Sequence, residues 1–414
     1  MDVIVERCAA LDVHKDTVMA CVRRPGPSGR QQEVRKFRTF TASLRQLRVW
    51  LAAEGVTRVA MEATGVYWRP VWHVLEALEG VELLLVNAHH VKNLPGRKTD
   101  VADACWLAQL LECGLLRGSF VPPTDIARLR DLTRYRKKLI EERAQEAQRI
   151  QKLLEDAGIK LDSVVSEVTG KSARLMLEAL MAGEQDVEVM ADMAIGRMRP
   201  KIGDLRLALE GRFNEHHALM LGMHLSHVDH LTAAIERMDA EVARLTVPFT
   251  EQIRRLCTVP GIGRRTAEVV IAEIGVDMSR FPTAAHLASW VGLCPGNHES
   301  GGKRRSGKAR KGNALLRTAL CEAAWSAART RNTYLAAQFR RFARRFGKNG
   351  QSKAAFAVAH TLIVSIWHML AQSVDYAELG ADHFDRRIDI ASHTHRLVRQ
   401  LELLGHRVTL EPAA

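Results

Sequence analysis

Two short apolar runs near the start of the chain each lead into an acidic residue, and this pattern limits the folds open to it. The run from Val3 to Leu11 meets Asp12 and is followed by an alternating run from Thr17 to Val22. Such a pattern predicts a β-hairpin with an acid at its hinge. A similar apolar run over residues 59–61 leads into Glu62.

Two more acids open a predicted helix. The segment VELLLVNAHHV is a continuous apolar run that predicts a strand buried on both faces. It precedes RKTDVADACWLAQLL, where Asp100 and Asp103 lie three residues apart at the start of an apolar-periodic helix and therefore share one side. Strands that end in acids are thus expected to meet a helix that carries acids.

The four acids Asp12, Glu62, Asp100 and Asp103 suggest metal-dependent phosphodiester chemistry. Carboxylates are ligands that Mg²⁺ or Mn²⁺ prefer, and four at one point would repel each other without cations. Two ions roughly 3.5–4 Å apart can activate an attacking oxygen and stabilise a leaving one. Taken singly, each acid has an ordinary explanation, because an Asp after a strand is usually a turn residue and Asp100 alone is more often a helix cap. The joint placement of the four favours the metal site.

The length and cysteine content bound the class of protein. A chain of 414 residues is long enough for two or three domains, each with its own core. The seven cysteines are odd in number and form no CxxC pair, and the N-terminus lacks a signal-peptide pattern, so we expect a protein of the reducing cytoplasm. The most apolar stretch, Ala354 to Leu370, is interrupted by His360 and His368 and predicts a buried helix rather than a membrane span.

The positive charge is concentrated in one segment. The chain has a net charge of +13, and residues 303–353 contain fifteen Lys and Arg residues against the single acid Glu322. A basic run is often only solvated surface. This concentration instead favours a polyanion partner, because each phosphate contact releases counterions. Nucleic acid is the natural candidate.

The middle of the chain predicts long helices. Thr124 to Ala157 is charged and helical after Pro122 and Pro123 mark a boundary, and Leu205 to Leu245 is a second helix-rich stretch. We expect the two to pack in a coiled-coil-like manner, within a chain or between protomers, as a spacer or oligomerisation region. Residues 159–200 predict a small helical insertion with no evident chemistry.

The C-terminal third contains a turn rich in glycine between two apolar-periodic segments. The sequence VPGIG, with Gly261 and Gly263, is typical of a helix-hairpin-helix, whose backbone N–H groups can hold a phosphate. Many such turns only join two helices. The adjacent basic segment favours contact with nucleic acid.

A serine follows in a loop surrounded by cations. In HESGGKRRSGKARKGN, Ser300 precedes two glycines, and a helix begins near Asn313. Serine can attack phosphorus when its proton is removed and neighbouring Lys or Arg stabilise the developing charge. Most serines in such loops are simply turn residues, and local chemistry does not separate Ser300 from Ser306.

Together these motifs resemble the insertion-sequence 110 family of transposases, which includes the Piv-type DNA invertases. ALDVHKD, AMEATGVYW and RKTDVADACWLAQL match the family's RuvC-like DEDD domain, and the span from VPGIG to KARKGNALLR matches its C-terminal transposase domain. The resemblance implies that Ser300 is the catalytic nucleophile, with Ser306 a lesser candidate. It also implies that the metal-binding, catalytic tetrad consists of Asp12, Glu62, Asp100 and Asp103.

Membership of this family implies an RNase H-like fold, Mg²⁺ or Mn²⁺, and recombination of double-stranded DNA through phosphoserine intermediates. The DNA partners would be the element ends, the circle junction and the target. Membership also implies a homo-oligomer, a dimer or tetramer, whose composite sites combine the metal domain of one subunit with the serine domain of another. Members are guided by an element-encoded bridge RNA, so the resemblance implies an RNA partner as well.

The predicted fold class is α/β plus α, in four parts. Residues 1–124 form a RuvC-like DEDD catalytic domain, and residues 125–250 a helical, coiled-coil-like linker or oligomerisation region. Residues 251–348 form a mainly helical transposase domain with the helix-hairpin-helix-like motif and the serine loop, and residues 349–414 a helical tail.

The residues expected to bind nucleic acid flank these motifs. Lysines beside the tetrad acids would hold phosphates, with ordinary solvent-facing cations as the alternative. The full set is Lys15, Lys98, Gly261, Gly263, Lys303, Arg304, Arg305, Lys308, Arg310 and Lys311.

Two other functions remain open from the sequence. A RuvC-like structure-specific nuclease would cut with metal-activated water and need the tetrad but not Ser300. An architectural DNA-binding protein would need neither, and its acids would be cap and turn residues.

Overall fold

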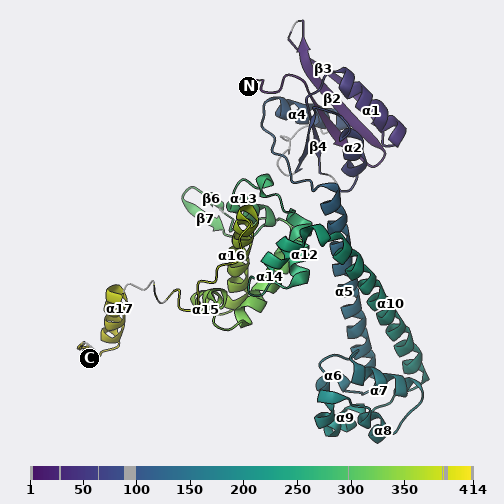
Figure 1. The fold of residues 1–414 in the computed structure, drawn as a ribbon, viewed down its shortest axis with the longest axis vertical. Coiled ribbons are helices and arrows are strands. Elements are labelled where there is room, and N and C mark those ends of the chain that lie inside the picture. Colours follow the sequence, from purple (N-terminus) through teal and green to yellow (C-terminus); the bar gives the residue numbers. More distant parts are fainter. Residues whose placement is uncertain are drawn as a thin grey trace. The chain divides into compact units, whose positions relative to one another are not determined.

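The computed structural model describes residues 3–27, 29–63, 65–87, 99–296, 298–384, 386 and 390–411. The chain divides into two compact units, Met1–Val121 and Pro122–Ala414 (Figure 1).

The first unit is built on a five-stranded sheet in the order β3-β2-β1-β4-β5. The first three strands are antiparallel, so the predicted hairpin around Asp12 is confirmed, and β4 and β5 run parallel to β1. The strands are β1 Cys8–Val13, β2 Thr17–Gly26, β3 Gly29–Arg38, β4 Arg58–Glu62 and β5 Glu82–Val86.

Helices cover both faces of this sheet, because β1 and β4 are apolar on both sides. Leu11 and Met61 pack in a core with α1 (Thr41–Ala53) and α2 (Trp68–Leu75). On the opposite face, Ala10 and Ala60 pack in a core with α4 (Asp100–Glu112). Small side chains at these positions let α4 approach the strands closely. The α/β character predicted for the N-terminal domain is confirmed.

The prediction that VELLLVNAHHV forms a strand buried on both faces is confirmed for β5 (Glu82–Val86), while residues 88–91 of this run lie outside the described residues. Leu83 and Leu85 pack in the core with α1 and α2, and Leu84 and Val86 pack in the core with α4. The strand is the last one in the sheet order, a position that the apolar run alone did not predict.

A buried ion pair fixes the far end of α4. Glu112, which is 3% exposed, accepts hydrogen bonds from Arg23 Nε at 3.0 Å and Arg30 Nε at 2.6 Å. Breaking such a pair costs on the order of 3–5 kcal/mol, because one charge is left buried and unpaired. The C-terminus of α4 is therefore tied to β2 and β3, and this sets the direction in which its first turn lies on the sheet.

The second unit begins with two long helices that pack on each other, α5 (Thr124–Asp156) and α10 (Glu215–Leu245). Arg136 of α5 pairs with Asp239 of α10, and Glu146, further along α5, pairs with His224, which comes earlier in α10. The helices are therefore antiparallel. Coiled-coil packing between protomers stays a prediction.

The stretch from Leu205 to Leu245 is not one helix. It divides into α9 (Ile202–Leu209) and α10, because Asn214 Oδ1 accepts from His217 N and caps a new helix. Short helices form the insertion between α5 and α10 and share one core with their ends. They are α6 Leu161–Val164, α7 Lys171–Met181, α8 Val187–Asp192, the 3₁₀ helix η1 Gly196–Lys201 and α9.

The C-terminal part of this unit is mainly helical. Its elements are η2 Val247–Phe249, α11 Thr250–Leu256, α12 Arg264–Ile274, η3 Met278–Arg280, α13 Ala284–Val291, β6 His298–Ser300, β7 Lys303–Ser306, α14 Ala314–Arg329, α15 Tyr334–Phe346, α16 Gly350–Gln372 and α17 Ile390–Leu403. The predicted boundary at residues 348–349 falls between α15 and α16, which pack against each other. The four-part division stays a prediction.

Among the described residues, α16 alone is long and apolar enough to cross a membrane by length and composition. It packs against α11, α13, α14 and α15, and half of its most apolar window is buried. These contacts are those of a core helix, as its interrupting histidines predicted.

A buried carboxylate joins three helices of this unit. Glu273 on α12 is fully buried and accepts two hydrogen bonds from Arg134 of α5, at 2.7 and 2.8 Å. It also accepts one from Asn313 Nδ2 at 2.6 Å, and Asn313 Oδ1 caps α14 by accepting from Leu316 N. The start of α14 is therefore fixed by charge-assisted hydrogen bonds to α12.

The backbone on either side of β6 and β7 is closely packed. A Cβ atom at Gly312 would lie 2.5 Å from the carbonyl oxygen of Val291, and one at Gly292 would lie 2.8 Å from that of Arg310. No real Cβ makes contacts this short. The segments that enter and leave the β6–β7 hairpin therefore touch backbone to backbone, which only glycine permits.

We expect Gly312→Ala to lower the stability of the second unit by about 1–3 kcal/mol, because the added methyl meets backbone that cannot move aside. Calorimetric unfolding would measure this. Gly203→Ala is the matched control, since a Cβ there meets nothing within 4 Å and Ala favours the helix α9. Equal unfolding temperatures for Gly312→Ala and the wild type would contradict the close packing.

Candidate functional site

Asp12 and Glu62 lie at the carboxyl ends of two neighbouring parallel strands, β1 and β4. Leu11 of β1 is the register partner of Met61 of the parallel neighbour β4, and Asp12 and Glu62 come next on the two strands. Parallel strands place such residues side by side. Because Leu11 and Met61 face α1 and α2, alternation directs both acids to the face covered by α4.

The first turn of α4 carries the other two acids to this face. Asp100 is the first residue of the helix and Asp103 follows within the same turn. Thr99 caps the helix, since its Oγ1 accepts from Ala102 N at 3.2 Å, so the interpretation of Asp100 as the cap is wrong. The Asp100 side chain does not cap the helix and is 56% exposed.

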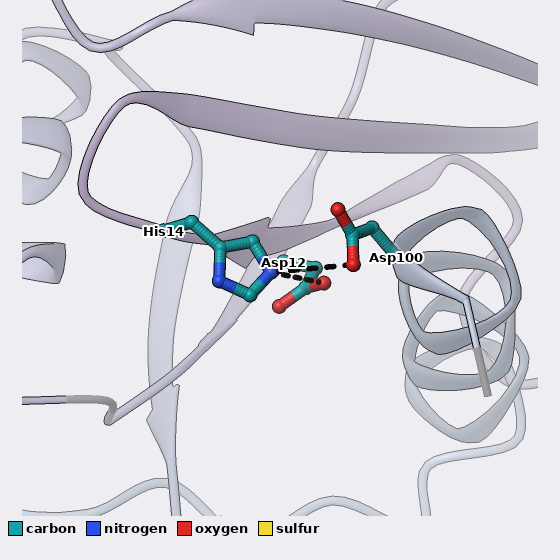
Figure 2. Close-up of side chains that lie close together, drawn as sticks. All are labelled: Asp12, His14 and Asp100. Atoms are coloured by element: carbon teal, nitrogen blue, oxygen red, sulfur yellow. Dashed lines mark hydrogen bonds and ion pairs between the residues drawn. The ribbon is translucent and has the colours of Figure 1, made fainter.

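His14 lies between Asp12 of β1 and Asp100 of α4 and contacts both carboxylates. Its Nε2 lies 3.1 Å from Asp12 Oδ2 and 3.5 Å from Asp100 Oδ1 (Figure 2). One ligand atom from each of these three residues lies within 4.8 Å of the others, a spacing that fits a metal ion. Among the described residues this is the one group of its kind.

Asp12 is a largely buried carboxyl whose pKa is raised mainly by that burial. Its side chain is only 12% exposed, and burial, together with the negative charges of Asp100 and Asp103, raises the pKa of its carboxyl above the usual range. His14 opposes this shift by its hydrogen bond and charge. An ionised carboxylate is therefore unfavourable here unless a positive charge accompanies it.

His14 was not identified from the sequence. It follows Asp12 by two residues in ALDVHKD, a spacing that keeps two side chains on one face of an extended strand. That spacing was the available signal, but many histidines near a turn are solvated. Lys15 is exposed in the same turn, and Lys98 lies outside the described residues.

The segment around Ser300 is a β-hairpin rather than an irregular loop. Ser300 pairs with Lys303 across the two-residue turn Gly301-Gly302, and both glycines have positive φ angles of 59° and 72°. These angles are typical of the tight hairpin turn that Gly-Gly favours. A Cβ on either glycine would meet nothing within 4 Å, so the turn is open.

The two candidate serines occupy different positions in this hairpin. Ser300 flanks the turn, whereas Ser306 pairs with His298 at the far end of β6 and β7. The side chains of Ser300, Arg304, Arg305 and Ser306 lie outside the described part of the structure. The remaining predicted phosphate contacts, Lys303, Lys308, Arg310 and Lys311, are exposed.

The glycines of the VPGIG turn have different surroundings. Gly261, with φ +92°, packs against the backbone of α14 at Ala323 and Ala327 so closely that no side chain fits. Gly263 precedes α12 as its N-cap, is exposed and has open space around it. Packing therefore explains Gly261 without a ligand, while phosphate binding at this turn stays a prediction.

Comparison with known proteins agrees with these motifs. A family model for the DEDD domain of insertion-sequence 110 elements, described as Transposase, matches residues 9–159. A second model, Transposase IS116/IS110/IS902 family, matches residues 253–340.

Curated relatives match over most of the chain. A probable family 20 transposase of Pseudomonas aeruginosa is 26% identical over 77% of this chain and 85% of its own length. The transposase for insertion sequence element IS1111A of Coxiella burnetii is 25% identical over 77% and 79%. The pilin gene-inverting protein of Moraxella bovis is 31% identical, over 39% of this chain and 48% of its own.

The family implies an enzyme that binds, cuts and rejoins DNA, and the DEDD domain implies use of a divalent metal. The two matched regions contain the acid cluster and the serine hairpin respectively. On the sequence motifs, the two family models and the relatives together, this chain belongs to the insertion-sequence 110 family of transposases.

Proposed function

We propose that this chain catalyses strand cleavage and exchange at the ends of an insertion sequence, with Asp12, Glu62, Asp100 and Asp103 as the metal-binding tetrad and Ser300 as the nucleophile. The observation that carries the proposal is the meeting of the strand-end acids with the first turn of α4 on one face of the sheet. Asp12 and Asp100 share a ligand group with His14, and the charge of Asp103 also acts on Asp12. Like charges this close together are stabilised by a cation.

The residues present fit a divalent metal. Asp12, Asp100 and His14 have ligand atoms within 4.8 Å of each other, and the raised pKa of Asp12 indicates a carboxylate that gains from a nearby cation. Carboxylate oxygens suit Mg²⁺ and Mn²⁺, and an imidazole nitrogen favours Mn²⁺ of these two. When bound, such ions supply charge stabilisation to a scissile phosphate and its leaving oxygen.

The serine hairpin supplies the nucleophile in this proposal. Ser300 Oγ loses its proton and attacks phosphorus, the bond to one DNA oxygen breaks, and that oxygen leaves as a hydroxyl with a proton. A DNA hydroxyl later reverses the step, so strands rejoin without an external energy source. The open turn beside Ser300 supports it over Ser306, which pairs at the other end of the hairpin.

Exposed cations near the hairpin would bind the phosphates. Lys303 follows the turn directly, and Lys308, Arg310 and Lys311 lie in the segment that leads to α14. Their charge would stabilise the phosphoryl oxygens during attack. Arg304, Arg305, Lys15 and Lys98 are proposed to assist.

The resemblance to the family supports three further parts of the proposal. The protein acts as a homo-oligomer, a dimer or tetramer, in which the acids of one subunit and Ser300 of another share a phosphate. A bridge RNA encoded by the element selects element ends and target. The reaction takes place in the cytoplasm, on double-stranded DNA.

We expect Asp12→Asn to weaken Mn²⁺ binding by about ten- to a hundredfold, because it removes a ligand charge at the centre of the cluster. Isothermal titration calorimetry of the DNA-free protein would measure this. Asp16→Asn is the matched control, since Asp16 is an exposed acid in the turn between β1 and β2 but is not one of the three clustered residues Asp12, His14 and Asp100. Equal affinity in Asp12→Asn and the wild type would place the metal elsewhere.

His14→Ala is expected to lower the affinity for Mn²⁺ more than the affinity for Mg²⁺, because only the former readily accepts a nitrogen ligand. The same titration with both ions gives the ratio of the two affinities. An unchanged ratio would show that His14 orients the acids without binding the ion.

Ser300→Ala is expected to abolish the covalent protein–DNA adduct formed with element-end DNA, Mg²⁺ and co-expressed flanking RNA. Ser306→Ala, the matched control on the same hairpin, should leave the adduct in place. A denaturing gel separates these outcomes. Cleavage that yields no adduct in any variant would instead indicate a nuclease that uses water.

A further inference from the structure

Helix α15 has one apolar and one strongly basic side. Leu335, Ala336 and Phe339 are buried, and the helix packs against α14 and α16. The opposite side carries Arg340, Arg341, Arg344 and Arg345, all exposed, and Lys348 follows just beyond the helix. These five residues are called the α15 basic face.

The four arginines form two short rows. Arg340 and Arg344 are four residues apart, as are Arg341 and Arg345, so each row advances about 6 Å along the helix axis. Guanidinium groups on adjacent turns of a helix repel each other when no anion lies between them. Repulsion between the arginines of this face is therefore unfavourable until an anion binds.

No carboxylate neutralises this face within the described part of the chain. The sequence has no Asp or Glu between Glu322 and Asp375, and no ion pair involves any of the five residues among those the structure describes. Arg341 lies over the ring of Phe384, 4.9 Å from its centre, which leaves its charge in place. By contrast, Arg134 and Arg136 of α5 are paired with buried carboxylates.

The backbone that bears the face is rigid. A Cβ at Gly350 would overlap the carbonyl oxygen of Ala343, so α15 and the start of α16 touch backbone to backbone. Gln338 Nε2 also donates to Thr361 Oγ1 of α16 at 3.1 Å. A rigid helix presents its arginines at fixed spacing, which lowers the entropy lost on binding.

We propose that the α15 basic face binds the phosphate backbone of duplex DNA that flanks the phosphate to be cut. This rests on the proposed function and extends it to a second contact surface. Arginines bind phosphates well, and contacts to the backbone position a duplex without reading its sequence.

The connection between the hairpin and α15 supports DNA as the occupant. Asn313, which caps α14, follows the serine hairpin, and α14 has 16 residues before the chain turns into α15. A helix of that length spans about 24 Å, the rise of about seven base pairs. The serine hairpin precedes α14 and α15 follows it within the same compact unit, so a short duplex has the length needed to contact both.

The test measures binding of a fluorescent 20-base-pair DNA of arbitrary sequence by the full chain over a range of salt concentrations. We expect the triple variant Arg340→Gln/Arg344→Gln/Arg345→Gln to bind at least tenfold more weakly. The slope of log affinity against log salt should fall by about 2.7, since each lost phosphate contact removes about 0.9. Arg344→Gln alone should lower the slope by about 0.9.

The matched control is Arg197→Gln/Arg199→Gln/Arg212→Gln, which removes three exposed charges from the helical insertion. A triple α15 variant that binds with the slope of this control would overturn the proposal. So would a variant that loses affinity only for an RNA duplex of the same length. Thermal unfolding followed by circular dichroism checks that the variants fold.

Adduct formation by the same preparations keeps this proposal distinct from the serine chemistry. A wild type that forms the adduct, with an unchanged slope in the α15 variant, overturns only the DNA-binding role of this face. A slope that falls as expected, without any adduct in the wild type, supports this face and contradicts the nucleophile.

Discussion

The packing of α4 on the small-residue face of the sheet is the contact on which the candidate site depends. Ala10 and Ala60 let the helix lie close to β1 and β4, and the next residue on that face of each strand is an acid. Glu112, paired with Arg23 and Arg30, fixes the other end of the helix. With that end held and the helix packed on the strands, the first turn carries Asp100 and Asp103 to the side of the sheet where Asp12 lies.

The serine hairpin is held by a different kind of contact. Its two flanking segments touch backbone to backbone at Gly292 and Gly312, and Asn313 is bound to the buried carboxylate of Glu273. A Cβ at either glycine of the turn would meet nothing within 4 Å, so the closely packed base of the hairpin leads to an open turn. A nucleophile needs this combination, because an attacking oxygen must be positioned while the substrate enters freely.

The sequence predicted the elements whose signals are local. The hairpin at Asp12, the helix at Asp100 and the long helix from Thr124 followed from alternation and periodicity, which report burial directly. The cover on both faces of β5 was predicted from its apolar run, but its edge position was not, because such a run does not show which strand lies beyond it. The break before α10 was missed because the cap at Asn214 lies within a continuous helix-rich stretch.

The site was predicted in part for the same reason. Acids at strand ends could be found in the sequence, but the bridging position of His14 depends on where α4 packs, which is a tertiary fact. The hairpin at Ser300 was interpreted as a loop, because three- and four-residue strands rich in charge carry little pattern. Glu273 gave no signal, since a glutamate on an amphipathic helix is usually solvated.

The most direct measurement is the yield of the Ser300 adduct against the concentration of divalent cation, in the wild type and in Asp12→Asn. If the acid cluster and the serine act on one phosphate, the wild-type yield should rise with the same midpoint as cation binding to the cluster, and Asp12→Asn should give no adduct. An adduct that forms in the presence of a chelator, or equally well in Asp12→Asn, would show that the serine acts without the metal site.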